Sequence, residues 1–169
     1  MARKKYAQIG LGGRHAMFRD AVLKDFADKC EMVAFSDINK GRLDNDVAYA
    51  KNTFGADVAA YHSDDFDKMI REKKPDVVIV TTKDSFHDEY ICRAMEAGCD
   101  VVTEKPMTID AKKCQRIIDT QRKTGRKCTV TFNYRYSPPR TQIKDMLMSG
   151  LIGEVLSVDF HWMLDTSHG

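Results

Sequence analysis

The segment Tyr6-Ala-Gln-Ile-Gly-Leu-Gly-Gly-Arg-His-Ala-Met-Phe18 decides the fold. A short apolar run ends at Gly10, a glycine-rich bend follows, and a helical pattern begins near Arg14. A strand, a glycine turn and a helix in this order present backbone N–H groups and the positive end of a helix to a diphosphate. Gly10 would permit the tight turn, and Gly12, which lacks a Cβ, would let the diphosphate approach the backbone. The alternative is an ordinary glycine turn between a strand and a helix.

The third position of the G-x-G-x-x-G pattern is His15 and not glycine, so the strict dinucleotide fingerprint is broken. Gly13 and Arg14 can compensate, because a guanidinium group binds phosphate oxygens well. The candidate cofactor-binding residues of this turn are therefore Gly10, Gly12, Gly13, Arg14 and His15.

A second strand is expected from Glu31 to Asp37, and it ends in a carboxylate. Asp37 lies about two dozen residues past the glycine turn, where a dinucleotide-binding fold places an acid that accepts hydrogen bonds from the adenosine ribose. A carboxylate also repels a 2′-phosphate, which favours NAD over NADP. Lys40 and Arg42 weaken this preference, and Arg42 is itself a candidate cofactor contact. The alternative is that Asp37 only caps the next helix.

The rest of the chain alternates strand and helix patterns, which is typical of a doubly wound parallel sheet. Strands are expected at 59–62, 76–82, 101–106 and 127–134, and helices at 39–53, 63–74, 88–97 and 109–124. Ligands bind at the carboxyl ends of the strands in such α/β sheets. We therefore expect the polar residues at these ends to converge on one site: Asp37, Thr81, Thr82, Glu104, Lys105 and Asn133.

The chain changes character after Ser137, where two prolines follow. We expect residues 1–137 to form a Rossmann dinucleotide-binding domain and residues 138–169 to begin a second, truncated α+β domain. A helix is expected at 141–151, and strict alternation at 155–164 predicts an antiparallel strand with one apolar face.

Composition excludes several classes of protein. A net charge of +2 over 169 residues is too small to indicate nucleic-acid binding. Nothing in the sequence resembles a signal peptide, and no apolar run approaches the length needed to span a membrane. The five cysteines are odd in number and form no C-x-x-C pair, which predicts reduced thiols in a cytoplasmic protein and no metal site.

The motif Glu104-Lys105-Pro106 resembles that of the Gfo/Idh/MocA oxidoreductases, which use NAD(P) and act mostly on sugars and cyclitols. The resemblance extends over essentially the whole chain. It also includes the Gly10-Leu11-Gly12 turn, Asp37, the segment Thr82 to His87, and Asn133-Tyr134-Arg135-Tyr136-Ser137-Pro138. The sequence departs from the family at His15 and at Lys83, where a proline is usual.

The resemblance implies that Lys105 is the catalytic residue, lying beside the nicotinamide and the substrate hydroxyl and helping to relay the proton. Glu104 would orient it, and the Lys105–Pro106 peptide would be cis. Structurally, the alternative for Lys105 is an exposed lysine before a proline bend. The remaining residues that match family positions are Asp84 and His87, which would line the cofactor, Asn133 near the nicotinamide, and Arg135 near the substrate.

Three functions stay open. The first is a dehydrogenase moving hydride between NAD and a sugar-like alcohol, and the second is a glycosidase that retains NAD. The third is a non-catalytic nucleotide-binding module. The family's partner base and most of its substrate pocket lie in a C-terminal domain, so we expect no turnover from this chain alone. The apolar face of the 155–164 segment predicts a homodimer formed through residues after Ser137.

Overall fold

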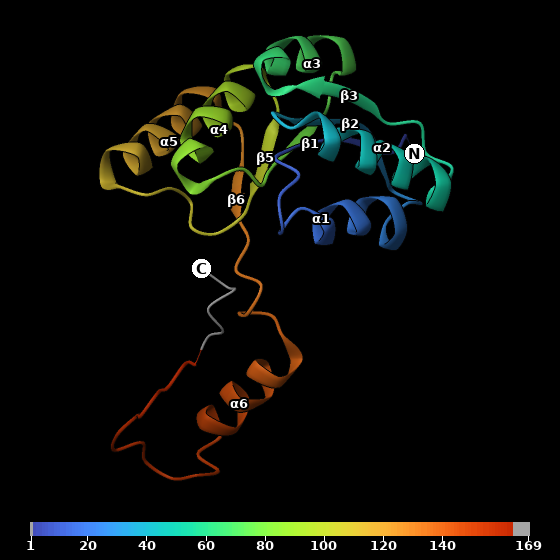
Figure 1. Cartoon of the computed structure of the whole chain (residues 1–169). Coiled ribbons are helices and arrows are strands. Elements are labelled where there is room, and N and C mark those ends of the chain that lie inside the picture. The colour runs from blue at the N-terminus through green and yellow to red at the C-terminus, as the bar shows by residue number, and fades with distance from the viewer. Residues whose placement is uncertain (1, 164–169) are drawn as a thin grey trace. The chain divides into compact units, whose positions relative to one another are not determined.

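The computed structural model describes residues 2–163, which divide into two compact units between Thr131 and Phe132. The first unit is a six-stranded parallel sheet in the order β3-β2-β1-β4-β5-β6, with helices on both faces (Figure 1). This is the strand order of a Rossmann fold. The strands are β1 (Lys4–Ile9), β2 (Cys30–Asp37), β3 (Ala59–His62), β4 (Val77–Val80), β5 (Asp100–Thr103) and β6 (Cys128–Val130).

Five helices connect these strands, and they follow the expected pattern closely. They are α1 (Ala16–Asp20), which continues as a π-helical turn at Ala21–Asp25, α2 (Lys40–Phe54), α3 (Phe66–Lys73), α4 (His87–Glu96) and α5 (Ala111–Thr124). Short 3-10 turns at Ser63–Asp65 and Asp84–Phe86 lead into α3 and α4. The predicted doubly wound α/β fold is confirmed.

The core consists of two layers, one on each face of the sheet. Alternation along β4 shows the division, because Val78 and Val80 pack in one layer and Ile79 packs in the other. The first layer includes Phe66 and Met69 of α3 together with residues of α4 and α5, and the second is formed with α1 and α2. Burial on both faces explains why β4 is apolar at every position.

The second unit contains α6 (Pro138–Met148), which begins earlier than the helix expected from Thr141. The strand predicted at 155–164 is wrong over residues 155–163, which have no strand structure, and Leu164 lies outside the described residues. A strand needs a neighbour to hydrogen-bond its backbone, and alternation in sequence supplies only the side-chain pattern. Leu156 and Val158, from the predicted apolar face, are 88% and 82% exposed.

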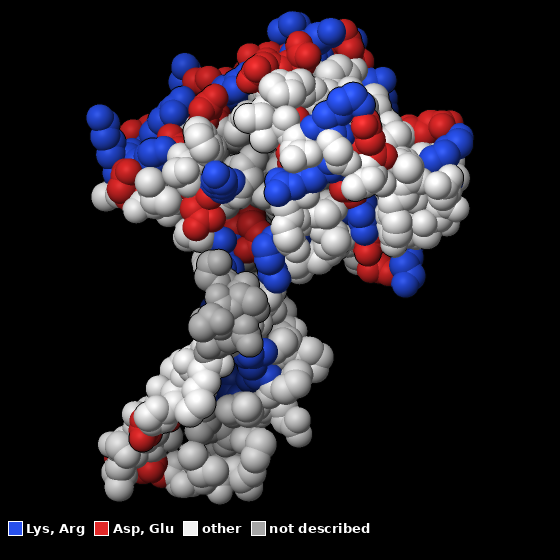
Figure 2. Space-filling view, in the orientation of Figure 1, with Lys and Arg blue, Asp and Glu red and all other residues white. Residues whose placement is uncertain are grey.

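Basic and acidic side chains are interspersed over the face of the first unit that Figure 2 shows, without a large area of one sign. None of the helices in residues 2–163 combines the length and the apolar character needed to cross a membrane.

Candidate functional site

The sheet register places four of the predicted site residues side by side. Ile9 is paired with Ser36 on β2 and with Val80 on β4, and Val80 is paired with Thr103 on β5. The next residue on each strand therefore lies in one row along the carboxyl edge of the sheet. This row consists of Asp37, Gly10, Thr81 and Glu104, in spatial order.

Gly10 is held against the neighbouring strand end. Its φ is +87°, and a Cβ at this position would lie 2.6 Å from the Thr81 carbonyl group and from the Thr82 nitrogen. The Thr81 hydroxyl group donates a hydrogen bond of 2.6 Å to the Gly10 carbonyl oxygen. Both the backbone conformation and the close approach to β4 therefore require glycine here.

Gly12 differs from Gly10, because no protein atom lies within 4 Å of the position that its Cβ would occupy. Its φ is also outside the left-handed region. The protein itself gives no steric reason for a glycine at this position. An open approach to the backbone is what a diphosphate needs, so the turn fits the phosphates of a dinucleotide.

Asp37 ties the end of β2 to the glycine turn. Its carboxylate is buried, and its two oxygens accept hydrogen bonds from the Leu11 amide at 2.6 Å and from the Asn39 amide at 2.7 Å. The cap of α2 is Asn39, whose side chain accepts a hydrogen bond from the Arg42 amide. Asp37 is therefore not the helix cap that we considered as its alternative role. Each of its oxygens keeps a further lone pair for a ligand.

A cavity of about 430 Å³ opens at this edge of the sheet. It brings together six of the predicted cofactor-binding residues: Gly10, Gly12, Asp37, Arg42, Thr81 and Thr82. None of its eight other lining residues was predicted as a site residue: Ile9, Ile38, Ser63, Asp64, Lys83, Phe86, Glu89 and Tyr90. Two signals could have found some of them. Ser63 and Asp64 directly follow β3, and Ile38 is a large apolar residue directly after the strand-end carboxylate.

Arg14 does not line this cavity. Its Nε and Nη2 atoms lie 3.2 and 2.7 Å from Oε1 of Glu104, at the end of β5. The Glu104 side chain is 5% exposed, and its Oε2 accepts a hydrogen bond of 2.6 Å from the Lys105 amide. The residue proposed to bind phosphate thus pairs with the motif that carries the candidate catalytic lysine.

His15 supports the glycine turn through its ring. Nδ1 lies 2.5 Å from the Gly12 carbonyl oxygen, and Nε2 lies 2.8 Å from Oδ1 of Asp46 on α2. Burial alone would lower the pKa of His15, but the hydrogen bonds to Asp46 and to the Gly12 carbonyl outweigh it and raise that pKa. Burial would raise the pKa of Asp46, and the hydrogen bonds from His15 and Arg19 lower it instead. Both ring nitrogens contact protein groups, so the ring's direct role is to hold the turn.

The segment around Lys105 is fixed by its neighbours. The Lys105–Pro106 peptide is cis, as the resemblance implied, and the Lys105 side chain is exposed. His87 is fully buried, with Nδ1 2.9 Å from the Pro106 carbonyl oxygen and Nε2 3.1 Å from the Thr82 carbonyl oxygen. His87 thus connects two loops of the site, whereas Asp84 is exposed and does not line the cavity.

Asn133 and Arg135 belong to the second unit, so their roles near the nicotinamide and the substrate stay predictions. Gly13 is exposed beside Gly12, and its role also stays a prediction. Among residues 2–163 there is no group of three or more His, Cys, Asp or Glu side chains placed to hold a metal ion.

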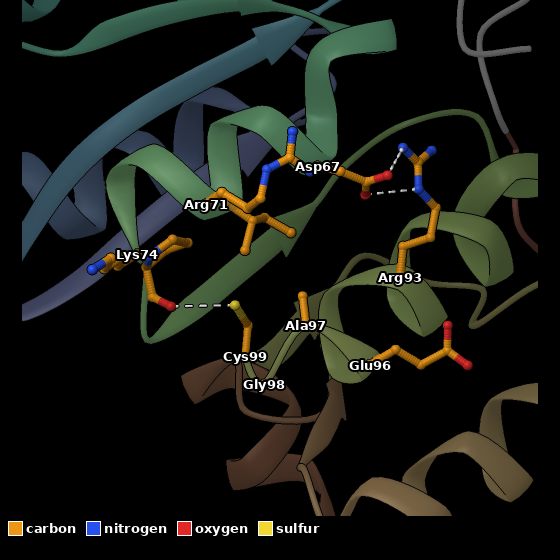
Figure 3. Close-up of a pocket in the computed structure, with 10 residues that line it drawn as sticks. Asp67, Arg71, Lys74, Arg93, Glu96, Ala97, Gly98 and Cys99 are labelled. Atoms are coloured by element: carbon orange, nitrogen blue, oxygen red, sulfur yellow. Dashed lines mark hydrogen bonds and ion pairs between the residues drawn. The ribbon is translucent and has the colours of Figure 1, made fainter.

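A second cavity, of about 690 Å³, contains none of the predicted site residues (Figure 3). It lies where α3 and α4 end, and opposite charges line it, with Arg93 paired to Asp67 at 3.1 Å. The Cys99 thiol there donates a hydrogen bond to the Pro75 carbonyl, and burial raises its pKa to about 11. The lining residues Arg71 and Arg93 lie in the last turns of α3 and α4, where basic residues are expected because they offset the negative dipole end of a helix. This cavity therefore has a structural explanation.

Comparison with known proteins identifies the family of the chain. Residues 4–132 match the model of the oxidoreductase family with the NAD-binding Rossmann fold (GFO_IDH_MocA). YteT of Bacillus subtilis, which is named as an oxidoreductase, is 39% identical over 98% of this chain and 39% of its own length. Glycosyl hydrolase family 109 protein 2 of Akkermansia muciniphila is 27% identical over 92% of this chain and 33% of its own length.

The crystal structure of myo-inositol 2-dehydrogenase from Lactobacillus plantarum has the same fold, with a TM-score of 0.79 and 22% identity. The match covers 91% of this chain and 43% of that one. The chain thus spans less than half the length of these relatives. Because the family model covers most of its residues, the chain belongs to the Gfo/Idh/MocA oxidoreductase family with the NAD-binding Rossmann fold.

Proposed function

We propose that this chain binds NAD at the carboxyl edge of its sheet, as the cofactor-binding part of an oxidoreductase. That enzyme would transfer hydride between the nicotinamide and a hydroxyl group of a sugar or cyclitol. The observation that carries the proposal is the pairing of an open glycine turn with a buried acid. Gly12 leaves its backbone accessible, and Asp37 holds the same turn through the Leu11 amide.

The residues of this edge would divide the work of binding. Gly12 and Gly13 would admit the diphosphate to the backbone, and Asp37 would accept hydrogen bonds from the adenosine ribose. Thr81 and Thr82 line the cavity on the β4 side. A bound nicotinamide would supply hydride transfer.

Lys105 would hold and move the proton of the substrate hydroxyl. It is exposed at the end of β5, and the next residue back is the buried Glu104. A lysine at the carboxyl end of a parallel strand, where ligands bind in such sheets, can serve as an acid/base group. This role also follows from the family's Glu-Lys-Pro motif.

The cofactor assignment is tested by titrating the chain with NAD and with NADP in a calorimeter. We expect NAD to bind more than tenfold tighter than NADP. With NADP bound, Asp37 would lose hydrogen bonds to the ribose worth about 1.5–3 kcal/mol each, and its carboxylate would repel the 2′-phosphate. Asp37→Asn should remove the preference, whereas Asp57→Asn, on the surface after α2, should not change it. Equal affinities of the unsubstituted chain for the two cofactors would refute the role of Asp37.

A second candidate is an NAD-retaining glycosidase, which the likeness to a family 109 glycosyl hydrolase favours. The two activities are distinguished in the whole enzyme by their products. A dehydrogenase accumulates NADH from a free sugar or cyclitol, whereas the glycosidase releases an aglycone without net NADH.

We further infer that the chain acts as a homo-oligomer through its second unit, which exposes Leu156, Val158 and Phe160. Light scattering of the intact chain should give a dimer, and removal of residues 154–169 should give a monomer that still binds NAD. A monomeric intact chain would contradict this assembly. The five free thiols support a reducing, cytoplasmic location.

A further inference from the structure

The contact between Arg14 and Glu104 joins two strand ends that are not neighbours in the sheet. Arg14 follows β1 and Glu104 follows β5, and β4 lies between these strands. The two residues are 90 positions apart in the sequence. Their contact therefore crosses the row of residues that forms the candidate cofactor site.

The two partners are in different environments. The Glu104 carboxylate is buried, so it needs a charged or hydrogen-bonded partner. The Arg14 side chain is half exposed, and both of its contacting nitrogens approach the same oxygen of Glu104. A guanidinium group has five N–H donors in a fork suited to two-oxygen anions, and this contact leaves most of them free.

Arg14 also lies two residues after Gly12, the open position of the turn. A diphosphate at Gly12 would bring two negative charges close to the base of this side chain, and it would compete with Glu104 for the guanidinium group.

We propose that Arg14 is the counter-ion of Glu104 in the cofactor-free chain and that it turns to the diphosphate when a dinucleotide binds. Glu104 is then released from Arg14 only when the glycine turn is occupied. Since Glu104 also holds the Lys105 amide, the exchange would connect occupancy of the phosphate site with the segment that carries the lysine. This inference rests on the proposed function and adds a residue that positions the Glu-Lys-Pro segment.

The exchange predicts an unusual result, because removing the Glu104 charge should improve binding. In Glu104→Gln, Arg14 no longer has to leave a buried carboxylate. ADP-ribose, which has the diphosphate but no nicotinamide, should bind about three- to tenfold tighter than to the unsubstituted chain. Adenosine, which lacks phosphate, should bind equally to both. In Arg14→Gln, the affinity for ADP-ribose should fall at least tenfold while that for adenosine is unchanged.

The double variant Arg14→Gln/Glu104→Gln identifies the source of the gain. If Arg14 mediates it, the double variant should bind ADP-ribose no better than Arg14→Gln. Glu31→Gln changes the net charge equally at the amino end of β2, where Glu31 lies 3.9 Å from Arg3, and it should have no effect. Calorimetry gives the affinities, and circular dichroism melts check the folding of each variant.

Three outcomes would overturn the proposed exchange. The first is an affinity for ADP-ribose that does not rise in Glu104→Gln, and the second is a rise that persists in the double variant, which lacks Arg14. The third is an equal loss of adenosine and ADP-ribose binding in Arg14→Gln. If Glu104→Gln does not fold, the Arg14 series decides. In that series, Arg14→Lys keeps the positive charge but not the forked donor geometry. Its affinity for ADP-ribose should lie between that of the unsubstituted chain and that of Arg14→Gln. A chain that binds neither adenosine nor ADP-ribose refutes the proposed function itself, and the exchange with it.

Discussion

Substituting alanine at Gly10 and at Gly12 should have opposite effects on folding and on binding. The two glycines belong to the same turn and are two residues apart, but their surroundings differ. A Cβ at Gly12 would meet no protein atom within 4 Å, whereas a Cβ at Gly10 would lie 2.6 Å from backbone atoms of Thr81 and Thr82. The pair therefore distinguishes a glycine kept for the fold from one kept for a ligand.

For Gly12→Ala we expect a stability equal to that of the unsubstituted chain or slightly higher. Replacing glycine by alanine at a compatible backbone conformation stabilises a protein by about 0.4–1 kcal/mol, because the unfolded chain loses freedom. NAD affinity should fall at least tenfold, since the methyl group occupies the approach to the backbone. Losing one hydrogen bond to a charged group costs about 1.5–3 kcal/mol, and 1.4 kcal/mol corresponds to a factor of ten.

For Gly10→Ala we expect a large loss of stability. A strained backbone conformation costs about 1–3 kcal/mol, and overpacking against a fixed neighbour costs about 1–3 kcal/mol more. Together these amount to roughly 2–6 kcal/mol, a large part of the 5–15 kcal/mol that is typical of a whole domain. The atoms that the new Cβ would meet are backbone atoms of β4 and the residue after it, which cannot move independently of the sheet.

Urea denaturation measures the free energy of unfolding of both variants, and calorimetry measures NAD binding. The reasoning is refuted if Gly12→Ala binds NAD with unchanged affinity, because the diphosphate would then not approach this backbone. A Gly10→Ala chain as stable as the original would show that the turn can move away from Thr81. Gly55→Ala, whose glycine has a φ of +67° at the end of α2 and no protein atom near its Cβ position, controls for strain without a clash.

Two further predictions concern titratable groups. Because the folded pKa of His15 is raised, its contact with Asp46 contributes stability in full below the unfolded value of 6.5, and that contribution is lost as the pH rises through the folded pKa. In urea denaturation, the free energy of unfolding of His15→Gln should therefore fall further below that of the unsubstituted chain at about pH 5.5 than at about pH 9. A difference that does not change with pH would contradict this role of His15. Burial raises the pKa of Cys99 to about 11, so brief alkylation near pH 8, followed by mass spectrometry, should label the partly exposed Cys114 before Cys99.

The elements of the sheet could be predicted from sequence because each depends on a local pattern. The apolar run at 77–80 is confirmed as a central strand, and the helices end close to the expected residues. The segment 155–163 shows the limit of this reasoning. Alternation defines which side chains would share a face, but a strand also needs a partner for its backbone, and the pattern does not say whether one is present.

For the candidate site, too, residues that carry a local signal could be predicted, and contacts between distant residues could not. Gly10, Gly12 and Asp37 could be singled out because a strand end followed by a glycine turn or an acid is a local signal. The register places Asp37 beside Gly10, and all three residues line the same cavity. The pairing of Arg14 with Glu104 was missed. Each residue was identified, but nothing in the spacing of two residues 90 positions apart indicates that they touch.

The absence of the third glycine has a physical explanation in the contacts of His15. In the dinucleotide fingerprint that glycine allows close packing of the helix on the strand. Here the Gln8 side chain donates hydrogen bonds of 3.1 Å to the His15 carbonyl oxygen and to the Thr81 hydroxyl, while the His15 ring contacts Asp46 on α2. Polar contacts thus hold the turn where close packing would otherwise do so.

This exchange of packing for polar contacts bears on how the turn can attract a diphosphate. Helix α1 begins at Ala16 and continues as a π-helical turn to Asp25, so the free N–H groups of its first turn give the glycine turn a partial positive charge. A full positive charge near Gly12 comes from a side chain instead, and Arg14, two residues after Gly12, is placed to supply it. Because Glu104 neutralises Arg14 in the free chain, the affinity for phosphate should depend on the strength of that ion pair as well as on the turn. The partner of that side chain, Glu104, can therefore regulate how strongly the glycine turn attracts a diphosphate.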